Sequence, residues 1–156
     1  MDGVRIWRLV DRPSTAAGVA DLLKATWPDY YGDGKGGCAT TDVSARMRVS
    51  GRPLGFVACD RADRVFGSVA LAGKSFGSAG EEADWLIGLC VSETARGKGI
   101  GSSLVKATES AARQEGTRTI YATTRSAAGL LTRLGWESMR VVSDGQHDWQ
   151  VMCRHL

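Results

Sequence analysis

An uninterrupted apolar run, WLIGLCV at positions 85–91, is the feature that most constrains the fold of this chain. Apolar residues that continue without alternation are typical of a strand buried on both faces of a sheet. A glycine-rich turn follows directly, and apolar residues at helical spacing then predict a long helix over 101–114. This strand, turn and helix favour an α/β fold in which helices cover a central sheet.

The rest of the chain supplies further strands and helices around this central unit. Alternating or apolar segments predict strands at 4–10, 54–60, 64–72 and 119–124, and two more within 137–156 that meet at Asp144-Gly145. Helical spacing with terminal signals predicts helices at 15–27, 40–51 and 126–136, whereas 28–37 and 73–84 have the composition of loops. We expect one α/β domain over residues 1–156, with a mixed, mostly antiparallel sheet flanked by helices.

Composition excludes several classes of protein. The net charge of +3 is small and its Lys and Arg residues are spread along the chain, which gives little support to nucleic-acid binding. No apolar run approaches the roughly 20 residues that a membrane-spanning helix needs, and the N-terminus lacks a signal-peptide pattern. The four cysteines are scattered, which favours reduced thiols in a cytoplasmic protein over a metal site or a disulfide framework.

The turn after the central strand has the chemistry of an anion site. Arg96 and Lys98 stand among Gly97, Gly99 and Gly101, just before the long helix. Free amides and the positive end of the helix dipole meet at a helix N-terminus, and glycines let an anion approach the backbone closely. The spacing fits neither a Walker loop nor the G-x-G-x-x-G dinucleotide turn. We therefore expect a phosphate-bearing ligand of another kind.

The spacing Arg96-x-x-Gly99-x-Gly101 resembles the pyrophosphate loop of the GCN5-related N-acetyltransferase (GNAT) family. The predicted strand order resembles that of the family over nearly the whole chain, and LTRLGW at 131–136 is similar to a late element of the family. The resemblance implies an N-acetyltransferase whose central strands splay apart after Val91. Acetyl-CoA would enter between the strands that end at Val91 and Thr124. The amine would attack it directly in a ternary complex, without a metal.

The resemblance also implies a set of residues that bind acetyl-CoA. Amides of 97–102 would hold the pyrophosphate, main-chain groups of 89–91 would pair with the pantetheine arm, and Thr124 stands where many members carry a cofactor-binding Asn. The expected set comprises Leu89, Cys90, Val91, Arg96, Gly97, Lys98, Gly99, Ile100, Gly101, Ser102 and Thr124.

Catalytic side chains are harder to identify. Leu131 stands where the family often has a Tyr that protonates the leaving thiolate, and Leu has no proton to donate. Either the thiolate leaves unassisted, or a hydroxyl such as that of Tyr121 or Thr124 substitutes, or the protein catalyses poorly. Asp84 is the candidate base that would remove the proton of the amine. The alternative is that Asp84 belongs to a solvated acidic loop.

Aromatic and acidic residues suggest where the acceptor binds. The candidate acceptor-binding residues are Trp27, Tyr30, Tyr31 and Glu82, with Asp29, Asp33 and Asp84 as further acids. They favour a small cationic amine. A peptide or protein amine as the acceptor, a non-catalytic acyl-CoA-binding module, and a homodimer remain open alternatives.

Overall fold

A seven-stranded sheet forms the centre of the protein in a computed structural model, which describes residues 3–156. The strands are β1 (Arg5–Arg8), β2 (Leu54–Cys59), β3 (Val65–Ala72), β4 (Trp85–Val91), β5 (Thr119–Thr124), β6 (Glu137–Ser143) and β7 (Asp148–His155). Their order in the sheet is β1-β2-β3-β4-β5-β7-β6. Only β4 and β5 are parallel neighbours, and every other pair is antiparallel. The predicted mixed, mostly antiparallel sheet is therefore confirmed.

Five α-helices accompany the sheet within residues 3–156: α1 (Ala16–Thr26), α2 (Pro28–Tyr31), α3 (Ala39–Arg46), α4 (Ile100–Gln114) and α5 (Ala128–Arg133). Short 3-10 turns lie at Leu9–Asp11, Pro13–Thr15 and Glu93–Ala95. The prediction of a loop over 28–37 is wrong for its first four residues. Proline at the first position of a helix loses no hydrogen bond, so Pro28 starts a new helical turn instead of continuing α1. No helix within residues 3–156 has the length and hydrophobicity to span a membrane.

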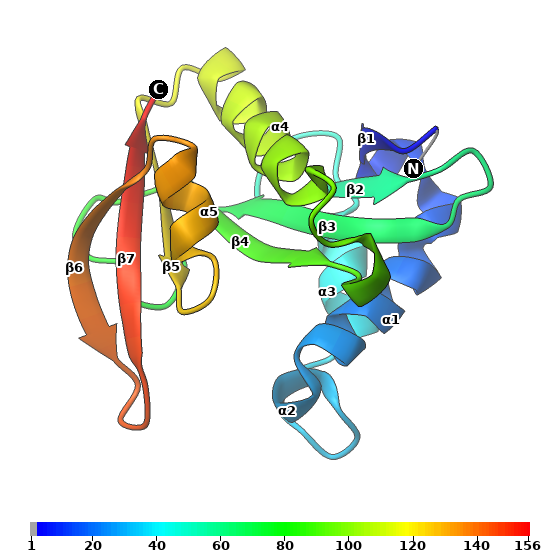
Figure 1. Cartoon of the computed structure of the whole chain (residues 1–156), viewed down its shortest axis with the longest axis horizontal. Helices are drawn as coiled ribbons and strands as arrows, with labels where there is room; N and C mark the ends of the chain where they lie inside the picture. Colours follow the sequence, from blue (N-terminus) through cyan, green and yellow to red (C-terminus); the bar gives the residue numbers. More distant parts are fainter. Residues whose placement is uncertain (1–2) are drawn as a thin grey trace.

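Helices cover both faces of the β1–β4 half of the sheet, as Figure 1 shows. On one face, α4 packs across β2, β3 and β4 over a core that includes Leu71, Leu104 and Ile120. On the other face, α1 and α3 pack over a core that includes Leu23, Val43 and Cys90. The central strand β4 is thus enclosed by helices on both sides, which explains its unbroken apolar sequence.

The sheet opens between β4 and β5. A single residue pair, Trp85 and Tyr121, links the two strands, and their rings stack with centroids 5.2 Å apart. The amide of Tyr121 donates to the carbonyl oxygen of Asp84 at 3.0 Å. Beyond this point the strands diverge, so that the β5–β7 half stands away from the tip of β4 in Figure 1. The predicted splay of the central strands is confirmed, but it begins directly after Trp85 and not, as expected from the sequence, after Val91.

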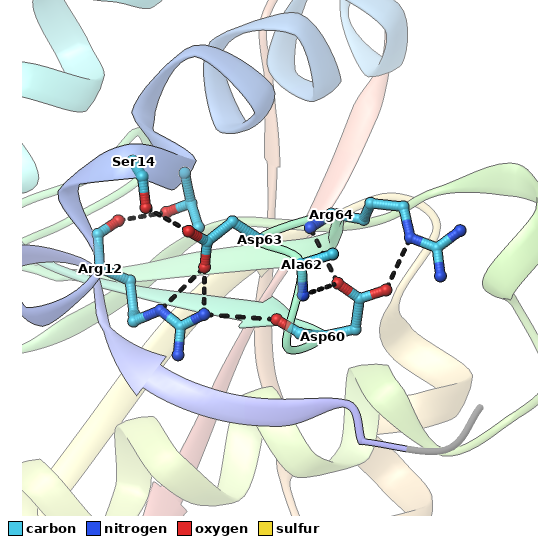
Figure 2. Close-up of polar contacts among 7 residues, drawn as sticks. Arg12, Ser14, Asp60, Ala62, Asp63 and Arg64 are labelled. Carbon is cyan, nitrogen blue, oxygen red and sulfur yellow. Dashed lines mark hydrogen bonds and ion pairs between the residues drawn. The ribbon is translucent and has the colours of Figure 1, made fainter.

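A polar cluster ties the segment before α1 to the turn between β2 and β3 (Figure 2). Arg12 and Ser14 both donate to the Asp63 carboxylate, and these hydrogen bonds, that of Ser14 foremost, lower the Asp63 pKa. Asp60 accepts from the amides of Ala62 and Arg64 at 2.9 and 3.0 Å, and from the Arg64 side chain at 2.7 Å. The cluster therefore holds the hairpin in place, far from the opening between β4 and β5.

Candidate active site

A cleft of about 610 Å³ lies where β4 and β5 diverge. Its lining comes from both sides of the sheet, because the end of α1 contributes Thr26, with Trp27 directly after it, while the start of α4 contributes Ile100 and Gly101. The full lining is Thr26, Trp27, Leu89, Cys90, Val91, Ala95, Arg96, Gly97, Gly99, Ile100, Gly101, Ser102, Ser126, Ala127, Leu130 and Arg133. A ligand in this cleft would therefore contact residues from both faces of the sheet.

The glycine-rich turn forms one end of the cleft. Gly97 and Gly99 have φ of +75° and +82°, in the left-handed region that favours glycine. The first main-chain hydrogen bond of α4 runs from the Ser103 amide to the carbonyl oxygen of Gly99, the last residue of the turn, at 3.0 Å. The amides of residues 100–102 precede this bond and belong to the free first turn of the helix. Arg96, whose Nε donates to the Val91 carbonyl oxygen at 3.2 Å, also lines the cleft, so this end of the cleft has the chemistry expected of an anion site.

A β-bulge interrupts β4 beside the cleft. Ser68 pairs with Cys90 and Ala70 with Ile87, so two residues of β4, Gly88 and Leu89, lie opposite the single residue between them in β3. Gly88 has φ of +61°. Residues 87–89 are half-exposed because β5 has already turned away, whereas both ends of β4 include buried residues. The bulge therefore turns main-chain groups away from β3, where a ligand in the opening can reach them.

Two of the predicted acetyl-CoA-binding residues do not line the cleft. Lys98 lies in a second hollow beside β1, with Val4, Arg5 and Ile6. Thr124 is buried, and its hydroxyl accepts a hydrogen bond from the Ala127 amide at 2.8 Å, just before α5. Every other member of the set predicted from sequence contributes to the lining.

The two candidate catalytic side chains lie at the closed end of the splay. Tyr121 stacks on Trp85, and burial, followed by the nearby Glu82, raises the pKa of its phenol. Asp84 accepts a hydrogen bond from Arg52 at 2.9 Å and another from Thr117. Both Tyr121 and Asp84 lie outside the cleft lining. Their roles in proton transfer stay predictions.

The aromatic residues after α1 separate into different environments. Trp27 lines the cleft, whereas Tyr30 is exposed. Tyr31 is buried between α1 and α3, and its hydroxyl donates to Asp42 at 2.7 Å. Burial, followed by this bond, raises the pKa of Tyr31.

Two of the acids that suggested a cationic acceptor, Glu82 and Asp84, have arginine partners. Arg140 donates to both carboxylate oxygens of Glu82 at 2.9 and 2.6 Å, and this bonding lowers the Glu82 pKa. Asp84 is paired with Arg52. Neither carboxylate is therefore an unbalanced negative charge.

Apolar side chains replace the expected acid on α5. Leu131 is buried in the core on the α4 side, and it is Leu130 that faces the cleft. Neither side chain can donate a proton. Cys90 also faces the cleft, but burial raises the pKa of its thiol to about 11, so it remains protonated at neutral pH and is a poor nucleophile.

Sequence reasoning missed several residues of the cleft. Ser126, Leu130 and Arg133 recur at helical spacing, so a helix over 126–136 could have placed them together on one face. Gly88, inside an otherwise apolar strand, is a recognised signal for a bulge. Residues 3–156 contain no group of three or more His, Cys, Asp or Glu side chains that could hold a metal ion.

Comparison with known proteins gives a family match and several fold matches. Residues 15–136 match the sequence profile of the acetyltransferase (GNAT) family. Among curated proteins, no sequence matches this chain significantly.

Solved structures share the fold at low sequence identity. An aminoglycoside 6'-N-acetyltransferase in complex with coenzyme A is 18% identical with a TM-score of 0.77, covering 97% of this chain and 96% of that one. The aminoglycoside 6'-N-acetyltransferase from Enterococcus faecium is 20% identical, with the same TM-score and coverage. Ard1 from Thermoplasma volcanium is 16% identical with a TM-score of 0.74, covering 99% of this chain and 98% of that one. At these identities the similarity concerns the fold alone.

Proposed function

Because the chain belongs to the acetyltransferase (GNAT) family, we propose that it transfers the acetyl group of acetyl-CoA directly to a primary amine of a small molecule. The observation that carries this proposal is the cleft between β4 and β5, which joins an anion site at one end to a strand bulge further in. A phosphate-bearing donor with a long neutral arm fits such a cleft.

The donor would bind along β4. Its pyrophosphate would accept hydrogen bonds from the amides at the start of α4, with Arg96 adding a positive charge. Its pantetheine arm has amide groups that can pair with the main chain of residues 89–91, as an added strand would. This pairing would bring the thioester to the bulge at Gly88 and Leu89.

The reaction would form a C–N bond and break the C–S bond of the thioester. The amine nitrogen attacks the carbonyl carbon, and negative charge then develops on the carbonyl oxygen. A main-chain amide at the bulge, which β3 does not pair, is suited to stabilise that charge. The amine loses a proton, and the departing thiolate gains one.

We propose Tyr121 as the donor of the proton to the thiolate. It lies at the point where the splay begins, and its raised pKa keeps the phenol protonated at neutral pH. Asp84 lies at the same end of β4 and is our candidate for the base, although its bonds to Arg52 and Thr117 also give it a structural role.

The acceptor would enter from the α1 side of the sheet. Trp27 lines this side of the cleft, and Asp29 and Asp33 are exposed on the segment between α1 and α3. These acids would attract an amine, which is cationic until it loses its proton. The other two predicted acids, Glu82 and Asp84, are neutralised by arginines, so we narrow the proposed acceptor to a small molecule that is cationic at the reacting amine.

A thiol-release assay tests the proposal. The purified protein is mixed with acetyl-CoA and, separately, diamines, aminoglycosides, amino acids and short peptides. We expect release of free CoA only when a small amine is present, together with one acetylated amine for each CoA. Binding of CoA without release for any amine would instead identify an acyl-CoA-binding module. Release with peptides alone would overturn the acceptor class.

A further inference from the structure

A buried arginine lies beneath the bulge of β4, with no hydrogen-bond or ion-pair partner for its guanidinium among residues 3–156. Arg46, at the end of α3, is only 6% exposed, and its Nη1 makes no hydrogen bond within residues 3–156. No ion pair of Arg46 occurs in this part of the chain either. An unpaired charge removed from water costs several kcal/mol. The fold therefore retains a buried positive charge that contributes no ion pair to its stability.

Two glycines make room for this side chain. A Cβ at Gly55 in β2 would lie 2.9 Å from the Cβ of Arg46, and a Cβ at Gly88 in β4 would lie 3.0 Å from Nη1. The side chain therefore crosses the face of the sheet from β2 to β4, and its guanidinium ends against the bulge. Any larger residue at either position would displace it, so the passage is shaped to the arginine.

The guanidinium lies on the face of the sheet from which we propose that the acceptor enters, next to the cleft and not among the residues that line it. Gly88 is half-exposed within the opening between β4 and β5, and Arg46 reaches it from the face that α1 and α3 cover. Tyr31, whose hydroxyl donates to Asp42, lies on the same face, close enough to Arg46 for the guanidinium charge to oppose the rise in the Tyr31 pKa. The anion site for the donor is at the start of α4, on the opposite face.

Resting on the function proposed above, we infer that Arg46 binds a carboxylate of the acceptor, so that the acceptor is a small amine of the amino-acid type. Acetyl-CoA bound as proposed would bring no negative charge close to Gly88, where the Arg46 guanidinium lies. Its phosphates would lie beyond Val91, at least three residues or roughly 10 Å along β4 from Gly88. The planar guanidinium matches a carboxylate through two parallel hydrogen bonds, which a lysine cannot form.

Paired acceptors test this inference. Thiol release is measured with α- and ω-amino acids and with the carboxamides of the same compounds, for wild type, Arg46→Met, Arg46→Lys and the control Arg48→Met. Arg48 is exposed two residues further along the chain, and within the described residues 3–156 its side chain bonds only to the Ser50 carbonyl oxygen. For each variant, kcat/KM for the amino acid is divided by kcat/KM for its carboxamide, and this ratio is compared between variants. The comparison cancels the difference in basicity between the two amines of a pair.

We expect Arg46→Met to lower this ratio by roughly 30-fold or more, the range for removing one partner of a buried charge pair. Arg46→Lys should retain part of the ratio, and Arg48→Met all of it. Calorimetry should give the same CoA affinity for every variant. The melting temperature of Arg46→Met should equal or exceed that of wild type, because an unpaired buried charge has been removed.

Other results would overturn the inference. A wild-type ratio that Arg46→Met leaves unchanged would remove Arg46 from acceptor recognition. An equal loss in both arms would mean that Arg46 acts on the thioester, and a melting temperature lowered by several degrees would mark it as structural. If wild type acetylates neither arm nor any other amine, the proposed function itself fails. If wild type acetylates amines but does not prefer the carboxylates over the carboxamides, the proposed acetyl transfer stands and only the carboxylate contact with Arg46 is wrong.

Discussion

Replacing Gly99 by alanine separates donor binding from folding. Gly99 has φ of +82°, and no atom outside its chain neighbours lies within 4 Å of the position its Cβ would take. The new methyl group therefore meets no protein atom, but it projects from a residue that lines the cleft next to the free amides of α4. Gly116, at the other end of α4, has φ of +85° and equally open surroundings. Gly116→Ala is thus a matched control, roughly 25 Å away along the helix.

The two variants should lose the same stability and differ in affinity. Holding alanine in the left-handed region costs about 1–2 kcal/mol, which lowers the melting temperature of a chain of this size by roughly 2–8 °C. In Gly99→Ala the methyl group also obstructs the pyrophosphate. Losing one hydrogen bond to a charged group costs about 1.5–3 kcal/mol, so CoA should bind roughly 10- to 100-fold more weakly.

Thermal melts and calorimetry with CoA measure both quantities. We expect similar melting temperatures for Gly99→Ala and Gly116→Ala, wild-type affinity in Gly116→Ala, and weakened affinity in Gly99→Ala alone. If both variants bind CoA as wild type does, the turn before α4 does not hold the pyrophosphate, and the reasoning from its amides is wrong.

Three further predictions concern protonation. Tyr121→Phe should lower kcat by roughly 100-fold and abolish the upper limb of the pH profile, without changing CoA affinity; unchanged kcat would mean that the thiolate departs unassisted. Iodoacetamide near pH 8 should label the exposed Cys38, whose pKa is lowered by hydrogen bonds from Thr41, but not Cys90, whose pKa is about 11. Peptide mass mapping that found Cys90 modified first would refute this. Hydrogen bonds from the amides of Gln146 and His147 lower the Asp144 pKa from 3.8 to about 2. Because the pKa is lower in the folded state, this stabilisation is present above pH 4 and is lost as the pH falls to about 2. Urea unfolding should follow that loss, and a slope against pH that persists in Asp144→Ala would assign it to other groups.

The central unit of the fold could be predicted from the sequence because each part has a local cause. The apolar run at 85–91 requires cover on both faces, and the glycines after it require positive φ before a helix. The segment at 28–31 was mistaken for a loop because its polar and aromatic residues have no helical period, and only Pro28 signals a helix start.

The candidate site was less predictable where it depends on side-chain direction. Thr124 and Lys98 belong to the right elements, but the divergence of β5 and the turn of the backbone point them away from the cleft. The phase of α5 decides that Leu130, and not Leu131, faces the ligand. The buried guanidinium of Arg46 gives no sequence signal, since arginine near a helix end is usually exposed.

A crystal structure with CoA bound would test the assignment of the cleft most directly. We predict that the pyrophosphate accepts hydrogen bonds from the amides of residues 97–102. The pantetheine arm should run along residues 89–91, with its sulfur at the bulge near Gly88. CoA bound in the hollow between β1 and Lys98, or an arm that leaves β4 without main-chain hydrogen bonds, would contradict this assignment.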